Sequence, residues 1–218
     1  MYMRHIFLSL ALAAGMLAAA EPPTAFYTQR ATLFELLPVD STSIVFLGNS
    51  ITNGCEWHEL LGNPRVVNRG ISGDIVQGMI DRVGSVVAGR PAKVFIMAGV
   101  NDISHDVSAD SIVRATARLI DIIQAGSPRT RIYLQSMLPF NTTGERWKRL
   151  KDKGQVRLDA NRLIGRLAAD KGVTWIELDD IFAAPDGDIR PELTNDGLHL
   201  LGPAYLLWRE RLQPYVEE

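Results

Sequence analysis

The sequence predicts one α/β domain, in which a central, mostly parallel five-stranded sheet lies between two layers of helices. Three observations support this fold class. Five short apolar runs are typical of buried strands, helical patterns lie between several of them, and 218 residues are enough for one ordinary domain. Strands that alternate with helices form parallel sheets, so we expect helices on both faces.

The expected strands follow one another along the chain as short, mainly apolar runs. They span residues 43–48, 65–68, 93–99, 131–136 and 173–178. In open sheets of this kind, ligands bind beyond the carboxyl ends of the strands. The residues that directly follow each run are therefore the first candidates for a functional site.

The expected helices occupy the intervals between these strands. The clearest one follows Ser108, a suitable N-cap, and Gly126 is placed to end it. Two more are expected over residues 156–171 and 203–216. A weaker helical pattern, which contains two glycines, covers residues 74–87.

The first twenty residues predict a cleavable signal peptide. A basic start at Arg4 precedes an apolar stretch over 6–17, and small residues follow up to Ala20. The whole apolar stretch is shorter than the about 20 residues that a membrane span needs, so an uncleaved anchor is the less favoured alternative. We expect cleavage after Ala20 and export of residues 21–218, as one domain without a stable membrane anchor, to the periplasm or the medium.

Composition excludes several classes of function. Lys and Arg number 23 against 25 Asp and Glu, and this net charge of −2 argues against a nucleic-acid partner. Hydrophobic residues make up 46% and charged residues 22%, as in globular proteins and unlike disordered chains, collagen or coiled coils. The single cysteine, Cys55, excludes an internal disulfide framework and a cysteine-based zinc site.

Polar motifs follow the first two expected strands. Ser50 lies at a strand-to-helix turn, where its hydroxyl can reach the sheet edge and its own N–H lies at a helix N-terminus that favours negative charge. Its alternative role is that of a simple helix N-cap. Gly73, after the second strand, can bring a backbone N–H close to an anion, or form no more than a tight turn.

Two further motifs complete the set. Asn101 follows the third strand, where its side-chain amide can donate to an oxyanion or form an Asx turn. Asp196 and His199 are three residues apart, so the carboxylate can fix the imidazole tautomer and leave its far nitrogen as a base. Together the motifs supply a nucleophile, three oxyanion donors and a general base with its orienting acid.

These motifs resemble those of the SGNH hydrolase superfamily, also called GDSL esterases and lipases, over most of the chain after residue 20. The resemblance implies a flavodoxin-like sheet and ester hydrolysis through an acyl-enzyme, without a metal ion or an organic cofactor. It implies the catalytic residues Ser50, Asp196 and His199 and the oxyanion-hole residues Ser50, Gly73 and Asn101. Asn49 departs from the family pattern, which has Asp there, at a position outside the triad.

The stretch from Gly48 to Ile71 is similar to exported carbohydrate O-acetylesterases, including sialate O-acetylesterases, and to platelet-activating-factor acetylhydrolase subunits. The resemblance thus implies a short-chain, most simply acetyl, ester of a small molecule or glycan, such as O-acetylated sialic acid. One alternative is a lysophospholipase or thioesterase of the same superfamily. Another is a non-catalytic carbohydrate-binding module, against which the intact triad argues. The sequence sets no oligomeric state.

Two basic features each have two interpretations. Arg69, directly after the second strand, can pair with Asp74, which we favour, or bind a substrate carboxylate. The basic stretch from Arg146 to Arg157 is most simply a solvated helical face. Its alternative role is a partner surface, or one that steers an anionic substrate.

Overall fold

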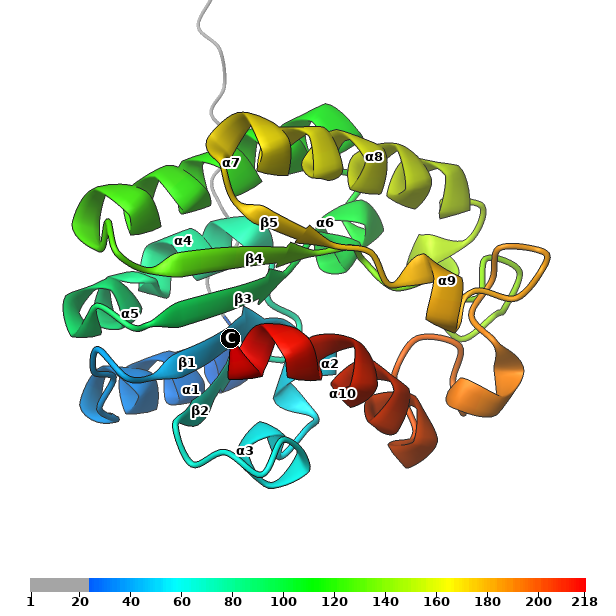
Figure 1. Cartoon of the computed structure of the whole chain (residues 1–218). Coiled ribbons are helices and arrows are strands. Elements are labelled where there is room, and N and C mark those ends of the chain that lie inside the picture. Colours follow the sequence, from blue (N-terminus) through cyan, green and yellow to red (C-terminus); the bar gives the residue numbers. More distant parts are fainter. Residues whose placement is uncertain (1–23) are drawn as a thin grey trace, which may run out of the picture.

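Five parallel strands form a single sheet in the order β2-β1-β3-β4-β5 (Figure 1). The computed structural model describes residues 24–218, so the expected signal peptide lies outside the described residues. The strands are β1 (Ile44–Gly48), β2 (Val66–Gly70), β3 (Lys93–Met97), β4 (Arg131–Gln135) and β5 (Thr174–Ile176). The sheet is all-parallel, which confirms the predicted α/β fold class.

Helices occupy most of the intervals between the strands. They are α1 (Ala25–Leu36), α2 (Ser50–Asn53), α3 (Trp57–Leu60), α4 (Val76–Arg82), α5 (Gly84–Gly89), α6 (Val100–Ser104), α7 (Ala109–Gly126), α8 (Gly154–Lys171), α9 (Asp179–Phe182) and α10 (Gly202–Glu217), with short 3₁₀ turns η1 (Lys148–Leu150) and η2 (Pro191–Leu193). The long helices α7, α8 and α10 confirm the expected ones. The expected helix over 74–87 is instead divided into α4 and α5 at Val83.

The caps of the long helices follow from their sequences. The hydroxyl of Ser108 accepts a hydrogen bond from the backbone N–H of Ser111 at the start of α7. Gly172 ends α8 in the left-handed conformation that glycine adopts without a steric cost. Apolar residues of α7 such as Ile112, Leu119 and Ile123 are fully buried, which explains the strong helical pattern there.

One face of the sheet carries a row of stacked aromatic rings. Phe46, Phe95 and Tyr133 occupy the same register on β1, β3 and β4, with ring centroids 4.8 and 4.4 Å apart. Trp57 of α3 stacks on Phe46 at 4.4 Å, and Trp208 of α10 meets Trp57 edge-on at 4.8 Å. This aromatic layer fixes α3 and α10 on one side of the sheet, and Figure 1 shows α1 and α4 on the other.

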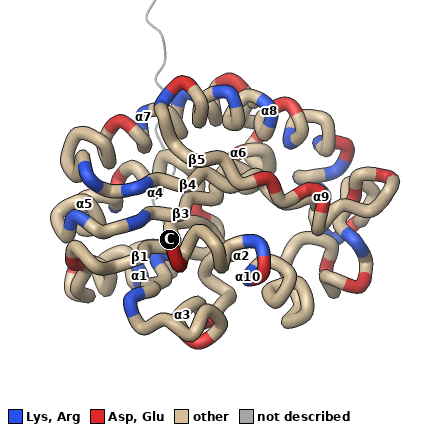
Figure 2. The backbone as a smooth tube through the Cα atoms, viewed as in Figure 1, with Lys and Arg blue, Asp and Glu red and all other residues tan. Residues whose placement is uncertain are grey.

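Charged residues are distributed around this core. Figure 2 shows basic and acidic segments interspersed along the helices and loops, with most of the strand residues uncharged. Within the described part of the chain, no helix is both long and apolar enough to cross a membrane.

Candidate active site

Ser50 is the first residue of α2, directly beyond the carboxyl end of β1. Asn49 caps this single helical turn, because its side-chain oxygen accepts a hydrogen bond from the backbone N–H of Ile51 at 3.1 Å. The turn from strand to helix is tight: a Cβ at Gly48 would lie 2.1 Å from the hydroxyl oxygen of Thr52. Only glycine fits at position 48, and the turn places Ser50 at the sheet edge.

His199 and Asp196 meet Ser50 from the loop before α10. The Nε2 atom of His199 lies 2.9 Å from the Oγ of Ser50, and its Nδ1 lies 2.8 Å from Oδ2 of Asp196. Ser50 and His199 are 149 positions apart in the sequence, so the fold alone creates this contact. The three residues form one continuous hydrogen-bonded chain from hydroxyl to imidazole to carboxylate.

The carboxylate of Asp196 holds its own loop as well as the imidazole. Its Oδ1 accepts hydrogen bonds from the backbone N–H groups of Leu198 at 2.9 Å and His199 at 2.8 Å. Burial alone would raise the pKa of Asp196, but hydrogen bonds from the side chain and backbone of His199 and from Leu198 lower it to about 2. Asp196 is therefore a carboxylate at neutral pH.

Thr194 supports the same turn, a role that was not predicted from the sequence. Its hydroxyl donates to the carbonyl oxygen of His199 at 2.7 Å and accepts from the backbone N–H of Gly197 at 2.9 Å. A threonine two residues before an aspartate is a common feature of turns, so the motif alone gives no sign of this double contact.

The loop that carries Gly73 follows β2, the strand next to β1. Because Gly48 of β1 is level with both Gly70 of β2 and Met97 of β3, the three strands end together. Gly73 has a φ of 81°, a conformation that favours glycine. The sequence-predicted residues Ser50, Gly73 and Asn101 thus follow three adjacent strand ends.

The Asn101–Asp102 pair attaches this loop to α6. The side-chain amide of Asn101 donates to the carbonyl oxygen of Asp74 at 2.8 Å. The buried carboxylate of Asp102 accepts from the backbone N–H of Val76, at 3.2 Å, and so caps α4. Burial raises the pKa of Asp102 to about 6, against the opposing effect of this hydrogen bond. Both side chains fix the Gly73 loop in place.

A buried ion pair attaches the same loop to the nucleophile strand. Nε of Arg82 lies 2.8 Å from Oδ2 of Asp74, and its Nη2 donates to the carbonyl oxygen of Gly48 at 3.1 Å. Burial raises the pKa of Asp74 to about 6, and Arg82 opposes that rise. Arg82 therefore links the loop of Gly73 to the end of β1, just before Ser50. No motif in the sequence predicts this role for Arg82.

The structure corrects both interpretations of Arg69. Its side chain is only 3% exposed and donates to the carbonyl oxygens of Leu37 and Pro38 after α1, both at 3.3 Å. Asp74 is paired with Arg82 instead. Arg69 therefore neither pairs with Asp74 nor reaches a substrate; it holds α1 against the sheet.

The basic stretch from Arg146 to Arg157 is not one solvated helical face, which corrects the favoured expectation. Arg157 is buried and pairs with Asp179, and Nζ of Lys153 lies 2.7 Å from a carboxylate oxygen of Asp106. The stretch divides because Arg157 lies inside α8, whereas its first residues form η1 and the end of the loop before it. Three basic residues of this first part line a cavity beside Asn101 and Leu198: Arg146, Lys148 and Arg149.

Among residues 24–218, no three His, Cys, Asp or Glu side chains gather in a way that could hold a metal ion. The chemical groups that the site does offer are a hydroxyl, an imidazole, a carboxylate and unoccupied amide donors. No hydrogen bond within the described residues occupies the backbone N–H of Ser50 or that of Gly73. Such an arrangement suits attack of a hydroxyl on a carbonyl carbon.

Comparison with known proteins identifies a family. Residues 46–205 match the GDSL-like lipase/acylhydrolase family. The chain is 27% identical over 164 residues to platelet-activating factor acetylhydrolase IB subunit alpha1 of Rattus norvegicus, a match that covers 72% of this chain and 67% of that protein.

Solved structures share the fold. A GDSL-like lipase from Bacteroides thetaiotaomicron superposes with a TM-score of 0.77 at 24% identity, covering 88% of this chain and 97% of that one. An acetyl xylan esterase superposes with a TM-score of 0.62 at 19% identity, covering 80% and 99% of the two chains. At these identities the likeness shows a common fold.

Proposed function

Because the chain belongs to the GDSL-like lipase/acylhydrolase family and is a carboxylic ester hydrolase, we propose that it cleaves short-chain acyl esters, most simply acetyl esters, with Ser50 as the nucleophile. One observation carries the assignment of residues: the chain of hydrogen bonds from Ser50 through His199 to Asp196, with links of 2.9 and 2.8 Å. This is the geometry that makes a serine hydroxyl nucleophilic.

The proposed reaction begins when His199 removes the proton of Ser50. The Nδ1–H of the imidazole donates to Asp196, which leaves Nε2 free to accept the hydroxyl proton as Oγ attacks the ester carbonyl. His199 then gives this proton to the departing alcohol, and the acyl group stays on Ser50. Water attacks the acyl-enzyme by the same route and releases the acid.

The negative charge on the carbonyl oxygen needs donors that are already in place. The backbone N–H groups of Ser50 and Gly73 have no acceptor within the described residues, and the amide nitrogen of Asn101 has a second hydrogen besides the one given to Asp74. We assign the oxyanion hole to these three donors. Each is anchored to a strand end, so it needs little rearrangement during the reaction.

Asn101→Ala is expected to lower kcat by roughly 10²–10³, because one preorganised oxyanion donor is removed. The measurement is kcat on 4-nitrophenyl acetate, together with the melting temperature, since the change also removes the hydrogen bond to Asp74. Asn101→Asp is the matched variant: it keeps the size of the side chain and replaces the donor by an acceptor. A loss of less than threefold in both folded variants would exclude Asn101 from the oxyanion hole.

We propose an acetyl group on a carbohydrate, such as O-acetylated sialic acid, as the ester that is cleaved. The curated relative is named as an acetylhydrolase, and one protein of the same fold is an acetyl xylan esterase. The signal peptide predicted over residues 1–20 adds a further reason, because we propose that the enzyme is exported and meets glycans outside the cytoplasm.

The acyl preference is tested with a series of 4-nitrophenyl esters. For residues 21–218, we expect kcat/KM to fall steeply from acetate to butyrate to octanoate, because an acetyl pocket excludes longer chains. The Ser50→Ala variant provides the blank rate. Activity that is equal or rises with chain length would support the lysophospholipase or thioesterase alternative.

A further inference from the structure

A cavity of about 430 Å³ lies beside the proposed catalytic residues. Asn101, Leu198 and the end of α6, with Ser104 and His105, form part of its wall, and the segment between β4 and α8 forms the rest. Trp147, in that loop, meets the imidazole of His199 edge-on, with ring centroids 5.3 Å apart and an interplanar angle of 66°. The cavity is thus next to the imidazole that would give its proton to the departing alcohol.

The wall of this cavity is strongly basic. It carries the cations of Arg146, Lys148 and Arg149, against the single carboxylate of Glu145. Lys148 lies 3.2 Å from Glu145, and Nε of Arg146 lies 3.9 Å from the carboxylate of Asp196. Arg149 makes no ion pair with any residue of 24–218, so its guanidinium remains available to an anion.

Trp147, which lines this cavity, also carries a hydrogen-bond donor without a partner in the described part of the chain. Its indole Nε1 is buried and has no acceptor among the described residues. A buried donor without a partner is costly, and such groups in a binding site are commonly satisfied by the ligand. A hydroxyl or ring oxygen of a bound alcohol would supply the acceptor.

We propose that this cavity binds the alcohol half of the ester, and that this alcohol carries a carboxylate or phosphate group held by Arg149. The inference rests on the proposed function and narrows its substrate class to acetyl esters of anionic alcohols. The planar guanidinium suits either anion, because it can donate two parallel hydrogen bonds to it. A small movement of the Trp147 ring would let its Nε1 donate to an uncharged oxygen of the same alcohol.

Two substrates that differ only in charge test this inference. They are 3-acetoxybenzoate and its neutral amide, 3-acetoxybenzamide. We expect the wild type to prefer the benzoate, and Arg149→Gln to lower the ratio of the two kcat/KM values about tenfold. The kcat/KM of this variant on the neutral amide should fall far less than its kcat/KM on the benzoate, because the amide carries no charge for Arg149 to bind.

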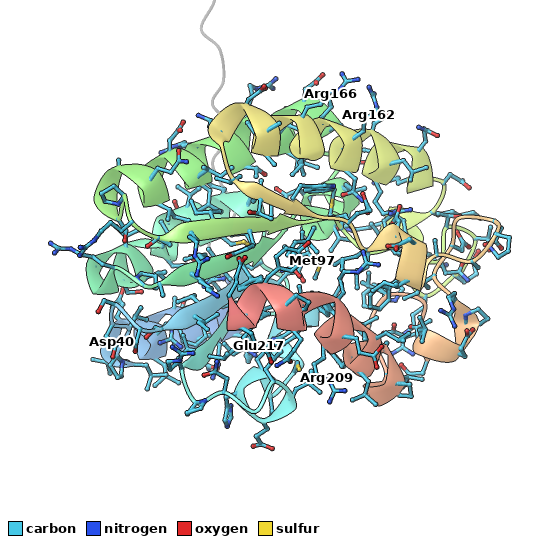
Figure 3. All side chains as sticks on the ribbon, in the orientation of Figure 1. Asp40, Met97, Arg162, Arg166, Arg209 and Glu217 are labelled. Atoms are coloured by element: carbon cyan, nitrogen blue, oxygen red, sulfur yellow. The ribbon has the colours of Figure 1, made fainter. Side chains whose placement is uncertain are left out.

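Arg162→Gln is the matched control, because Arg162 lies on the outer side of α8 and points away from the sheet (Figure 3). It removes the same charge and should leave the substrate ratio unchanged. The inference would be overturned if Arg149→Gln left the ratio of the two kcat/KM values unchanged. It would also be overturned if Arg162→Gln lowered that ratio by the same factor. Failure of the wild type on 4-nitrophenyl acetate would instead overturn the proposed function.

Binding to the inactive Ser50→Ala variant tests the cavity without turnover. Calorimetry should show that 3-hydroxybenzoate or 3-hydroxyphenyl phosphate binds at least about tenfold more tightly than 3-hydroxybenzamide. Whichever anion binds more tightly identifies the charged group of the natural alcohol. Equal affinity for all three compounds would refute the anion site, whatever the catalytic activity of the wild type.

Discussion

Ser50→Ala is expected to lower kcat on 4-nitrophenyl acetate by on the order of 10⁶, and His199→Ala by a similar factor. The hydroxyl that attacks and the imidazole that activates it lie 2.9 Å apart and act as one unit. The double variant should therefore be no slower than either single variant. The measurement is kcat for the four proteins, with the melting temperature as a check on folding.

Ser41→Ala is a suitable control for this experiment, because it makes the same chemical change at an exposed turn before β1. It should leave kcat unchanged. If the losses in the two single variants instead multiplied in the double variant, Ser50 and His199 would act independently. That result would contradict a shared proton transfer.

Asp196→Asn is expected to lower kcat by about 10⁴ while preserving the fold. The asparagine oxygen can still accept the backbone N–H groups that Asp196 holds now, so the turn should survive. The asparagine amide cannot accept the Nδ1–H of His199 as the carboxylate does, and the imidazole would take the other tautomer. Its Nε2 would then carry a proton and could not accept the one from Ser50.

The same variant gives a pH-dependent difference in stability. Hydrogen bonds lower the pKa of Asp196 from its ordinary 3.8 to about 2, so the ionised form is favoured in the folded protein. This contribution to the free energy of unfolding is fully present above pH 4 and is lost as the pH falls toward 2. The stability gap between wild type and Asp196→Asn should therefore shrink over that interval. A constant gap would show that the carboxylate charge contributes nothing.

The strand ends were predictable because buried parallel strands are continuous apolar runs, and their turns carry the polar residues. Ser50, Gly73 and Asn101 could be placed at one edge on this basis alone. Asp196 and His199 were predictable as a pair by their spacing, and the structure brings this pair to Ser50. Their meeting depends on the position of the loop before α10, which no local pattern encodes.

The partner of Asp74 could not be read from the sequence. Arg69 is nearer in the chain, but it is a strand residue on β2 whose side chain is turned toward the carbonyl groups after α1. Arg82 is the last residue of α4, and its side chain has the length and direction to reach both Asp74 and Gly48. The direction of the side chain, and not its distance along the chain, decides which arginine pairs with Asp74.

Helix α1 was not predicted from the sequence, for a different reason. Only Phe34 of this helix is buried, while Leu33 and Leu36 are exposed. Its apolar residues therefore follow no helical period that could be recognised. The charges of the basic stretch from Arg146 to Arg157 predicted one solvated helical face. This prediction was wrong because Arg157 is buried and pairs with Asp179.

Covalent labelling with a fluorophosphonate tests the identity of the nucleophile most directly. Such reagents phosphonylate a serine that is activated by a neighbouring base. We predict one adduct per chain, found by peptide mass mapping on Ser50, absent from Ser50→Ala and formed at least about 10³ times more slowly in His199→Ala. An adduct on any other residue, or an equal rate of labelling in His199→Ala, would contradict the assignment of Ser50 as a nucleophile activated by His199.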